Sequence, residues 1–262
     1  MRRVISIALA GTLLLGLNGC GLDLKPGAKS LFEALAPPTP TEAADMALSE
    51  DPDERFKGLQ LLANAPFGGG DPYLELYADS LEDEDPGVRW AAVTALGRHG
   101  GPQHVELILP FLNDEDALVR SATARALQRI HEPVAIGPLL ASIRFENEPV
   151  DAVRAQAADA LGQYATRPVL QGLVAALDDS NLAVNRSTLS SLETLTGQNF
   201  GLDQRAWLDW IREAGSDVFA ARSPYVFPTF QRERKLVEYL PLIADPPNES
   251  PNTPVGMPPM GG

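Results

Sequence analysis

The 262-residue sequence is poor in several residue types that support chemistry. It contains a single cysteine and three histidines, and its 35 aspartate and glutamate residues outnumber its 21 lysine and arginine residues, for a formal net charge of −14. One cysteine excludes an internal disulfide and a thiolate-ligated metal site. The acidic balance disfavours nucleic acid as a partner, because bound phosphates need basic side chains to neutralise them.

Catalytic signatures are also missing. The sequence has no G-x-S-x-G, no phosphate-binding P-loop and no H-E-x-x-H. None of His99, His104 and His131 has a histidine partner at a metal-binding spacing. We therefore expect a non-enzymatic protein with no cofactor and no metal.

The lone cysteine lies at the end of the opening stretch MRRVISIALAGTLLLGLNGCG. Two arginines precede an apolar run at residues 4–17, which is shorter than the ~20 residues that span a bilayer. A basic head, a short apolar run and small residues after it are typical of a secretory signal. An ordinary signal with an incidental cysteine, or an uncleaved anchor, remain as alternatives.

The residues before Cys20, Leu-Asn-Gly, resemble the lipobox of bacterial lipoproteins. This resemblance implies that residues 1–19 are a signal peptide and that Cys20 carries fatty acyl chains such as palmitate. It also implies anchoring to a lipid bilayer on the extracytoplasmic side of the cell envelope. Gly21, not an aspartate, directly follows Cys20, and the resemblance to lipoproteins of two-membrane bacteria therefore implies the outer membrane if the cell has two membranes. Residues 20–41, rich in Gly, Pro and Thr, are expected to form a flexible tether.

The middle of the chain repeats. The stretches DEDPGVRWAAVTALG, DEDALVRSATARALQ, EPVDAVRAQAADALG and DSNLAVNRSTLSSLE align on valines at 88, 119, 153 and 184, with a divergent copy at 51–65. Each copy predicts a helix capped by an Asp or Asn, and an apolar helical segment precedes it. Gly97 and Gly162 are expected to end such helices with positive φ. The valines are 31, 34 and 31 residues apart. Repetition at this spacing indicates a solenoid.

The D-x-x-V-R-x-x-A-A-x-A-L-G pattern resembles the HEAT family, in its short bacterial type related to the phycobilisome lyases. The resemblance implies an all-α, right-handed alpha-alpha superhelix over residues 42–196, with about five helix pairs and a C-terminal capping helix. It also implies a hydrogen-bonded ladder of acids and arginines. The pairs implied are Asp83 or Asp85 with Arg89, Asp114 or Asp116 with Arg120, and Glu148 with Arg154, whereas Asn185 breaks the pattern in the last copy.

Beyond the repeats, residues 197–240 are predicted to form a cap and a docked extension. Trp207, Trp210 and Ile211 share one helical face, which favours covering the solenoid end, although ligand stacking is the alternative. Residues 241–262 are proline-rich and are expected to be disordered. The aromatic residues expected to dock on the solenoid are Phe219, Tyr225, Phe227 and Phe230.

The second helix of each repeat also carries a candidate binding stripe. Positions two, six and ten after the repeat valine lie on one helical face, away from the apolar face. The partner-binding residues predicted on this stripe are Trp90, Arg98, Arg125, Arg129 and Arg186. An acidic segment of a protein partner would complement these arginines. Alternatively, the arginines pair with neighbouring acids such as Asp159 and stay solvated.

These observations predict a membrane-anchored, non-catalytic HEAT-repeat scaffold that mediates protein–protein interactions at the cell envelope. An accessory or transferase-type protein that holds a substrate in the concave groove is one alternative. A purely structural envelope lipoprotein is another. The di-iron chemistry of the deoxyhypusine hydroxylases is not supported, because their repeated His-Glu pairs are represented here by His131-Glu132 alone.

Overall fold

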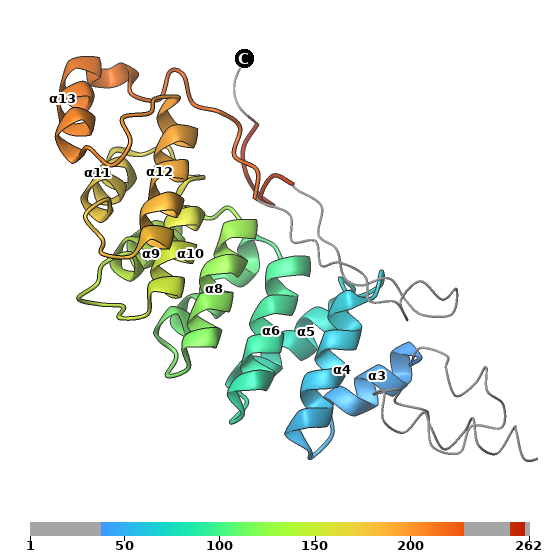
Figure 1. Ribbon diagram of the computed structural model, residues 1–262. Coiled ribbons are helices and arrows are strands. Elements are labelled where there is room, and N and C mark those ends of the chain that lie inside the picture. Colours follow the sequence, from blue (N-terminus) through green and yellow to red (C-terminus); the bar gives the residue numbers. More distant parts are fainter. Residues whose placement is uncertain (1–37, 228–251, 260–262) are drawn as a thin grey trace, which may run out of the picture. The chain divides into compact units, whose positions relative to one another are not determined.

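The computed structural model describes residues 38–227 and 252–259, and its helices are labelled as in Figure 1. Residues 39–227 and 252–259 belong to one compact unit. The predicted signal peptide, the acylated Cys20, most of the tether and Phe230 lie outside the described residues.

The described chain is a succession of helix pairs. Its α-helices are α3 (Pro40–Ala47), α4 (Pro52–Asn64), α5 (Asp71–Asp79), α6 (Pro86–His99), α7 (Val105–Ile108), α8 (Ala117–Arg129), α9 (Ile136–Ser142), α10 (Asp151–Leu161), α11 (Arg167–Ala176), α12 (Leu182–Thr196) and α13 (Gln204–Ala214). The second helices of the pairs, α4, α6, α8, α10 and α12, pack side by side in sequence order (Figure 1). We call this set the second-helix row. Two isolated β-bridges are the only extended pairing within the described ranges, so the predicted all-α solenoid of five helix pairs is confirmed.

The first helices of the pairs are shorter than the second ones. The segment before α8 is divided into the 3₁₀ turn η3 (Pro102–His104), the single turn α7 and the 3₁₀ segment η4 (Leu109–Asn113). Pro110 lies at the start of η4 and cannot donate a backbone hydrogen bond, so a regular α-helix cannot continue through it.

Most second helices begin at the side-chain caps that the repeats predict. Asp85 Oδ1 accepts hydrogen bonds from the N–H groups of Gly87 and Val88, and Asp51, Asp116 and Asn181 cap their helices in the same way. α10 is the exception, because Val150 holds its N-cap position and provides no side-chain cap.

A ladder of largely buried ion pairs joins neighbouring copies. Arg89 Nε and Nη2 donate to the two carboxylate oxygens of Asp114 at 2.8 and 2.9 Å, while Nη1 donates to the carbonyl oxygens of Asp83 and Glu84. The equivalent pairs are Arg55–Asp83, Arg120–Glu148 and Arg154–Asp179. Each arginine therefore binds the turn of its own copy through carbonyl oxygens and the acid of the next copy through its guanidinium fork.

This pairing corrects the expected ladder in two ways. An arginine pairs with the acid of the following copy, not with an acid of its own copy as in the expected Glu148–Arg154 pair. Asp85 and Asp116 are N-caps, because each lies directly before its helix, where its side chain meets free N–H groups. In the last copy, Asn185 Nδ2 donates to Asp179 O at 2.9 Å, so it keeps the carbonyl contact but has no charge for a further pair.

Gly97 and Gly162 do not adopt the predicted positive φ. Gly97 lies inside α6, and the C-cap Gly162 has φ −59°. An added Cβ on Gly97 would lie 2.6 Å from the Cβ of Ala126, and one on Gly162 would lie 2.7 Å from Ser191 Oγ. Neighbouring second helices approach closely at these two positions, and this leaves no room for a side chain on either residue.

The end of the solenoid is covered by α13, as the sequence predicts. Trp207 is fully buried, Ile211 is 8% exposed and Phe200 packs edge-on against Trp207 with ring centroids 4.9 Å apart. Gln204 Nε2 donates to the carbonyl oxygens of Val174 and Ala175 at the end of α11. The tryptophan face is thus used for packing.

Candidate interaction surface

The second-helix row keeps part of its predicted stripe exposed. Arg125 on α8 and Arg186 on α12 are both exposed, and Arg125 Nε donates to Gln156 Oε1 on α10 at 3.4 Å. Trp90 on α6 is partly buried, since its ring packs against Phe56 with centroids 6.0 Å apart. These side chains are placed where a partner lying along the row would meet them.

Two other predicted stripe residues are less accessible, since Arg98 is partly buried and Arg129 is buried. Arg98 Nη1 donates to Ala63 O at 3.0 Å and also contacts Asn64, and burial lowers the pKa of Arg98. Arg129 is 9% exposed, and its guanidinium lies 5.8 Å from the ring centroid of Phe227. Burial, together with the charges of Arg125 and Arg98, lowers the pKa of Arg129 to about 10. The prediction that Arg129 offers a surface contact is therefore wrong: the chain's own C-terminal region covers it.

Asp159 on α10 is the acid that the sequence offers as a partner for the stripe arginines. Burial raises the pKa of Asp159 to about 6, although a hydrogen bond from Ser187 and the charge of Arg125 favour ionisation. Among the residues described, no ion pair joins Asp159 to a stripe arginine. The alternative that neighbouring acids neutralise the stripe arginines is therefore supported only by the longer-range attraction between Asp159 and Arg125.

The chain that follows α13 crosses the carboxyl ends of three second helices (Figure 1). Ser223 N–H donates to Thr194 O on α12 at 2.8 Å. Tyr225 is 8% exposed, its hydroxyl donates to Asp159 O at 2.7 Å, and it accepts from Gln128 Nε2 at 2.9 Å. Because these contacts use α12, α10 and α8 in turn, they hold the extension against the row.

Residues 252–259 also lie on the solenoid, which corrects the expected disorder for this part of the tail. Val255 N–H donates to Arg129 O, and His131 N–H donates to Val255 O, both at 2.8 Å. Phe227 N–H donates to Asn252 O at 3.1 Å. α8 ends at the extended residue Ile130, with φ −120° and ψ 121°, and this geometry leaves backbone groups that a second segment can bind.

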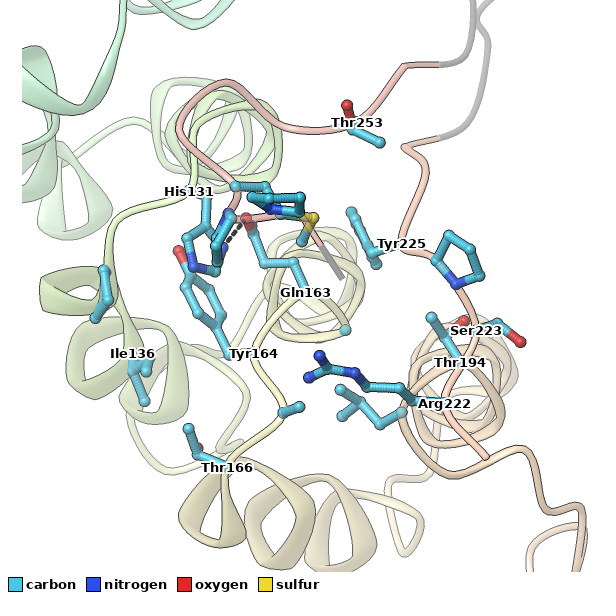
Figure 2. Close-up of a pocket in the computed structure, with 18 residues that line it drawn as sticks. His131, Ile136, Gln163, Tyr164, Thr166, Thr194, Arg222, Ser223, Tyr225 and Thr253 are labelled. Atoms are coloured by element: carbon cyan, nitrogen blue, oxygen red, sulfur yellow. Dashed lines mark hydrogen bonds between the residues drawn. The ribbon is translucent and has the colours of Figure 1, made fainter. Parts of the chain in front are cut away.

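A cavity of about 490 Å³ lies between these C-terminal segments and the turns that follow α8 and α10 (Figure 2). Its lining is mainly apolar and aromatic, with His131 stacked on Tyr164 at a centroid distance of 4.8 Å. Gln163 Nε2 donates to Leu127 O and Ala160 O, so its Oε1 is an acceptor and His131 Nδ1, 3.1 Å away, carries the hydrogen. Burial lowers the pKa of His131 and so favours its neutral form.

Neither a metal site nor a membrane-spanning helix is found in the part of the chain that the structure describes. Over residues 38–227 and 252–259, no three potential metal ligands come together. In the same ranges, no helix has both the length and the hydropathy to cross a bilayer.

Sequence reasoning placed Tyr225 among the residues expected to dock on the solenoid, but it missed the contact of Val255. The only local signal for Val255 is the Pro-x-Gly spacing of residues 254–256, which is typical of a turn. Nothing in the tail itself indicates where on the solenoid such a turn binds.

Comparison with known proteins supports the repeat type. Residues 74–151 match the family described as HEAT repeats, and residues 153–179 match the PBS lyase HEAT-like repeat. No curated protein matches the chain. The repeats are therefore of the HEAT type.

Solved structures with a similar arrangement are distant in sequence. An engineered protein is 18% identical, with 68% of this chain and 86% of that chain covered and a TM-score of 0.50. A designed armadillo repeat protein is 17% identical (68% and 88% covered, TM-score 0.47), and human deoxyhypusine hydroxylase in complex with glycerol is 19% identical (62% and 75% covered, TM-score 0.40). At this identity the first likeness is one of fold alone.

Proposed function

We propose that this HEAT-repeat protein is a non-catalytic scaffold, tethered to the cell envelope through an acylated Cys20, whose second-helix row binds an acidic segment of a protein partner. HEAT-like solenoids commonly serve as interaction scaffolds, since stacked repeats present one extended surface. The lipobox-like stretch that ends at Cys20 supports the anchor.

The observation that carries the binding proposal is the exposure of Arg125 and Arg186 on the row of a chain with a net charge of −14. Within residues 38–227 and 252–259 neither arginine forms an ion pair. Arginine is enriched at binding hot spots, and its planar fork binds carboxylates in a bidentate manner. The partly exposed Trp90 adds a flat apolar contact on the same row.

Charge reversal tests the proposal. The double variant Arg125→Glu/Arg186→Glu is expected to reduce capture of the crosslinked partner about tenfold or more, because rim charges set partner recognition. The matched control is Arg144→Glu/Arg205→Glu, which makes the same charge change at two exposed positions outside the row. Equal partner recovery from both double variants, with an unchanged circular dichroism spectrum, would refute the binding surface.

A further inference from the structure

The end of α8 and the segment at residues 252–259 form a ligand-like contact within one chain. The ion-pair ladder, the helix N-caps and the hydrophobic core are formed by the repeats themselves. Residues 252–259, in contrast, are held on the solenoid by the backbone hydrogen bonds of Val255 and by a turn that fits against the helix ends, and Asn252 O accepts a further hydrogen bond from Phe227 N–H. This contact is separate from the exposed arginines of the row.

The tail residues at the contact form a β-turn. Met257 N–H donates to Pro254 O at 3.2 Å, which closes a four-residue turn, and Gly256 at its third position has φ +85°. A turn with this pattern is of type II, in which the third residue needs a positive φ and is therefore usually glycine. Closing the turn uses Pro254 O and Met257 N–H, so both backbone polar groups of Val255 are free to bind α8.

Each residue of the turn has a different environment at the contact. Pro254 is buried, whereas the side chain of Val255 is 52% exposed and contributes mainly its backbone. A Cβ on Gly256 would lie 2.6 Å from Pro102 Cγ and 3.0 Å from His131 O, so a side chain is excluded there. Met257 is partly buried and lines the cavity, in which about 490 Å³ remains open beside it.

We infer that the end of α8, with Pro102 and the cavity beneath the C-terminal segments, is a peptide-binding site for a Pro-x-Gly-apolar turn, and that residues 254–257 occupy it in cis. The ligand is a turn of a partner protein, with proline first, any residue second, glycine third and an apolar side chain fourth. The backbone N–H and C=O of the second turn residue bind the Arg129 carbonyl and the His131 N–H, and these two hydrogen bonds fix the position of the turn. The apolar fourth residue enters the cavity. A partner that carries this turn displaces the chain's own segment.

The inference deepens the proposed scaffold function by naming a second kind of partner segment. It uses the ends of the second helices, whereas the acidic-segment site uses Arg125 and Arg186. The Arg125→Glu/Arg186→Glu variant therefore leaves turn binding unchanged, and failure of either site is seen separately.

The test uses the full chain and a labelled synthetic peptide of residues 252–259. Gly256→Val in the protein strains the left-handed position and clashes with Pro102, so it releases the tail from the site and leaves the solenoid residues of the site unchanged. Because a β-branched residue is strongly disfavoured at this φ, we expect the peptide to bind the Gly256→Val chain at least about tenfold more tightly than the wild-type chain, where the tail competes.

Peptide variants give the matched controls. A peptide with the equivalent of Gly256→Val is expected to lose binding, and one with the equivalent of Val255→Ala is expected to bind as well as the parent. Hydrogen exchange at the His131 amide gives a second readout: Gly256→Val should lower its protection, and added peptide should restore it. A peptide that does not bind the Gly256→Val chain, binds regardless of its glycine, or leaves His131 exchange unchanged would overturn the inference.

Discussion

Arg154 and Asp179 form a buried pair across 25 residues of sequence, with Arg154 Nε 2.7 Å from Asp179 Oδ2. Their side chains are 3% and 6% exposed, and Arg154 Nη1 also donates to Glu148 O at 2.9 Å. One guanidinium on α10 thus ties together two turns of the chain, the turn before α10 and the turn before α12. This contact is a rung of the ladder that holds the repeats in register.

Removing one partner of this rung should strongly destabilise the solenoid. Asp179→Ala leaves the Arg154 charge buried without its carboxylate, and such a loss costs about 3–5 kcal/mol of unfolding free energy. Asp209→Ala is the matched control, because it removes a carboxylate from Arg212 in a pair with side chains 76% and 53% exposed, where the effect should be below about 1 kcal/mol. Urea denaturation of both variants measures the difference, and equal midpoints would contradict the role assigned to the ladder.

The same rung predicts loss of stability in acid. Burial alone would raise the pKa of Asp179, but hydrogen bonds from Arg154 and from the Asn181 N–H outweigh it and hold the pKa below its usual value. Asp83 and Asp114 are shifted in the same direction by Arg55 and Arg89. Since the folded pKa values are depressed, this stability is complete above the ordinary carboxyl pKa of about 4 and is lost as the pH falls below it. Thermal melts at pH 6 and pH 3 should show it, and the Asp179→Ala variant should lose less stability over this interval than the wild type.

Asp159 predicts the opposite pH dependence. Its folded pKa of about 6 lies above the ordinary value, so the folded state binds the proton more tightly and stability falls as the pH rises from about 4 to about 6. Asp159→Asn is neutral at every pH and should therefore stabilise the protein by about 1–2 kcal/mol at pH 7.5, after allowing for partial exposure. At pH 4 the gain should vanish. A gain of the same size at both pH values would show that the carboxyl is not shifted.

Two glycine substitutions should have effects of opposite sign. Gly97→Val places a side chain where a Cβ would already lie 2.6 Å from the Cβ of Ala126, and such overpacking costs about 1–3 kcal/mol. Gly137→Ala in α9 meets no atom within 4 Å of the added Cβ and should stabilise the helix by up to about 1 kcal/mol. Melting temperatures of the two variants test whether α6 and α8 approach as closely as described; a tolerated valine at 97 would mean that they do not.

The sequence alone predicts the repeating part of the molecule well. Valines at a fixed spacing, together with Asp85 and Asp116 before their helices, carry enough local information to place the second helices and their caps. The partner of Arg89 was harder to predict, because Asp83 and Asp114 are equivalent positions of two copies. Only the packing of one turn against the next decides that the arginine reaches forward.

The candidate site was less predictable for a physical reason. Burial of Arg129 depends on Phe227, and the position of Val255 depends on carbonyl and amide groups that become available where α8 ends. Neither contact has a periodic signal, since each joins segments far apart in the chain. Composition suggested disorder for the tail, yet the turn at Pro254–Met257 follows from the proline and glycine once an acceptor for the Val255 amide is known.

Lipid attachment at Cys20 has its own test. Mass spectrometry of the mature chain is expected to find Cys20 as the first residue, carrying fatty acyl chains, and Cys20→Ala should release the protein from the membrane fraction because the acyl chains provide the anchor. Ser30→Ala is a control change in the same region of the chain. An unmodified Cys20, or a Cys20→Ala protein that still sediments with membranes, would remove the tether from the account.

Site-specific photocrosslinking in intact cells tests the central claim most directly. A photoreactive residue in place of Ser121, one turn before Arg125 on α8, should form an adduct with a protein partner. The same residue in place of Leu107, which is 48% exposed on a first helix, should not. The account predicts one adduct that is specific to position 121 and is lost in the Arg125→Glu/Arg186→Glu background. The same adducts from both positions, or an adduct at 121 that survives charge reversal, would contradict it.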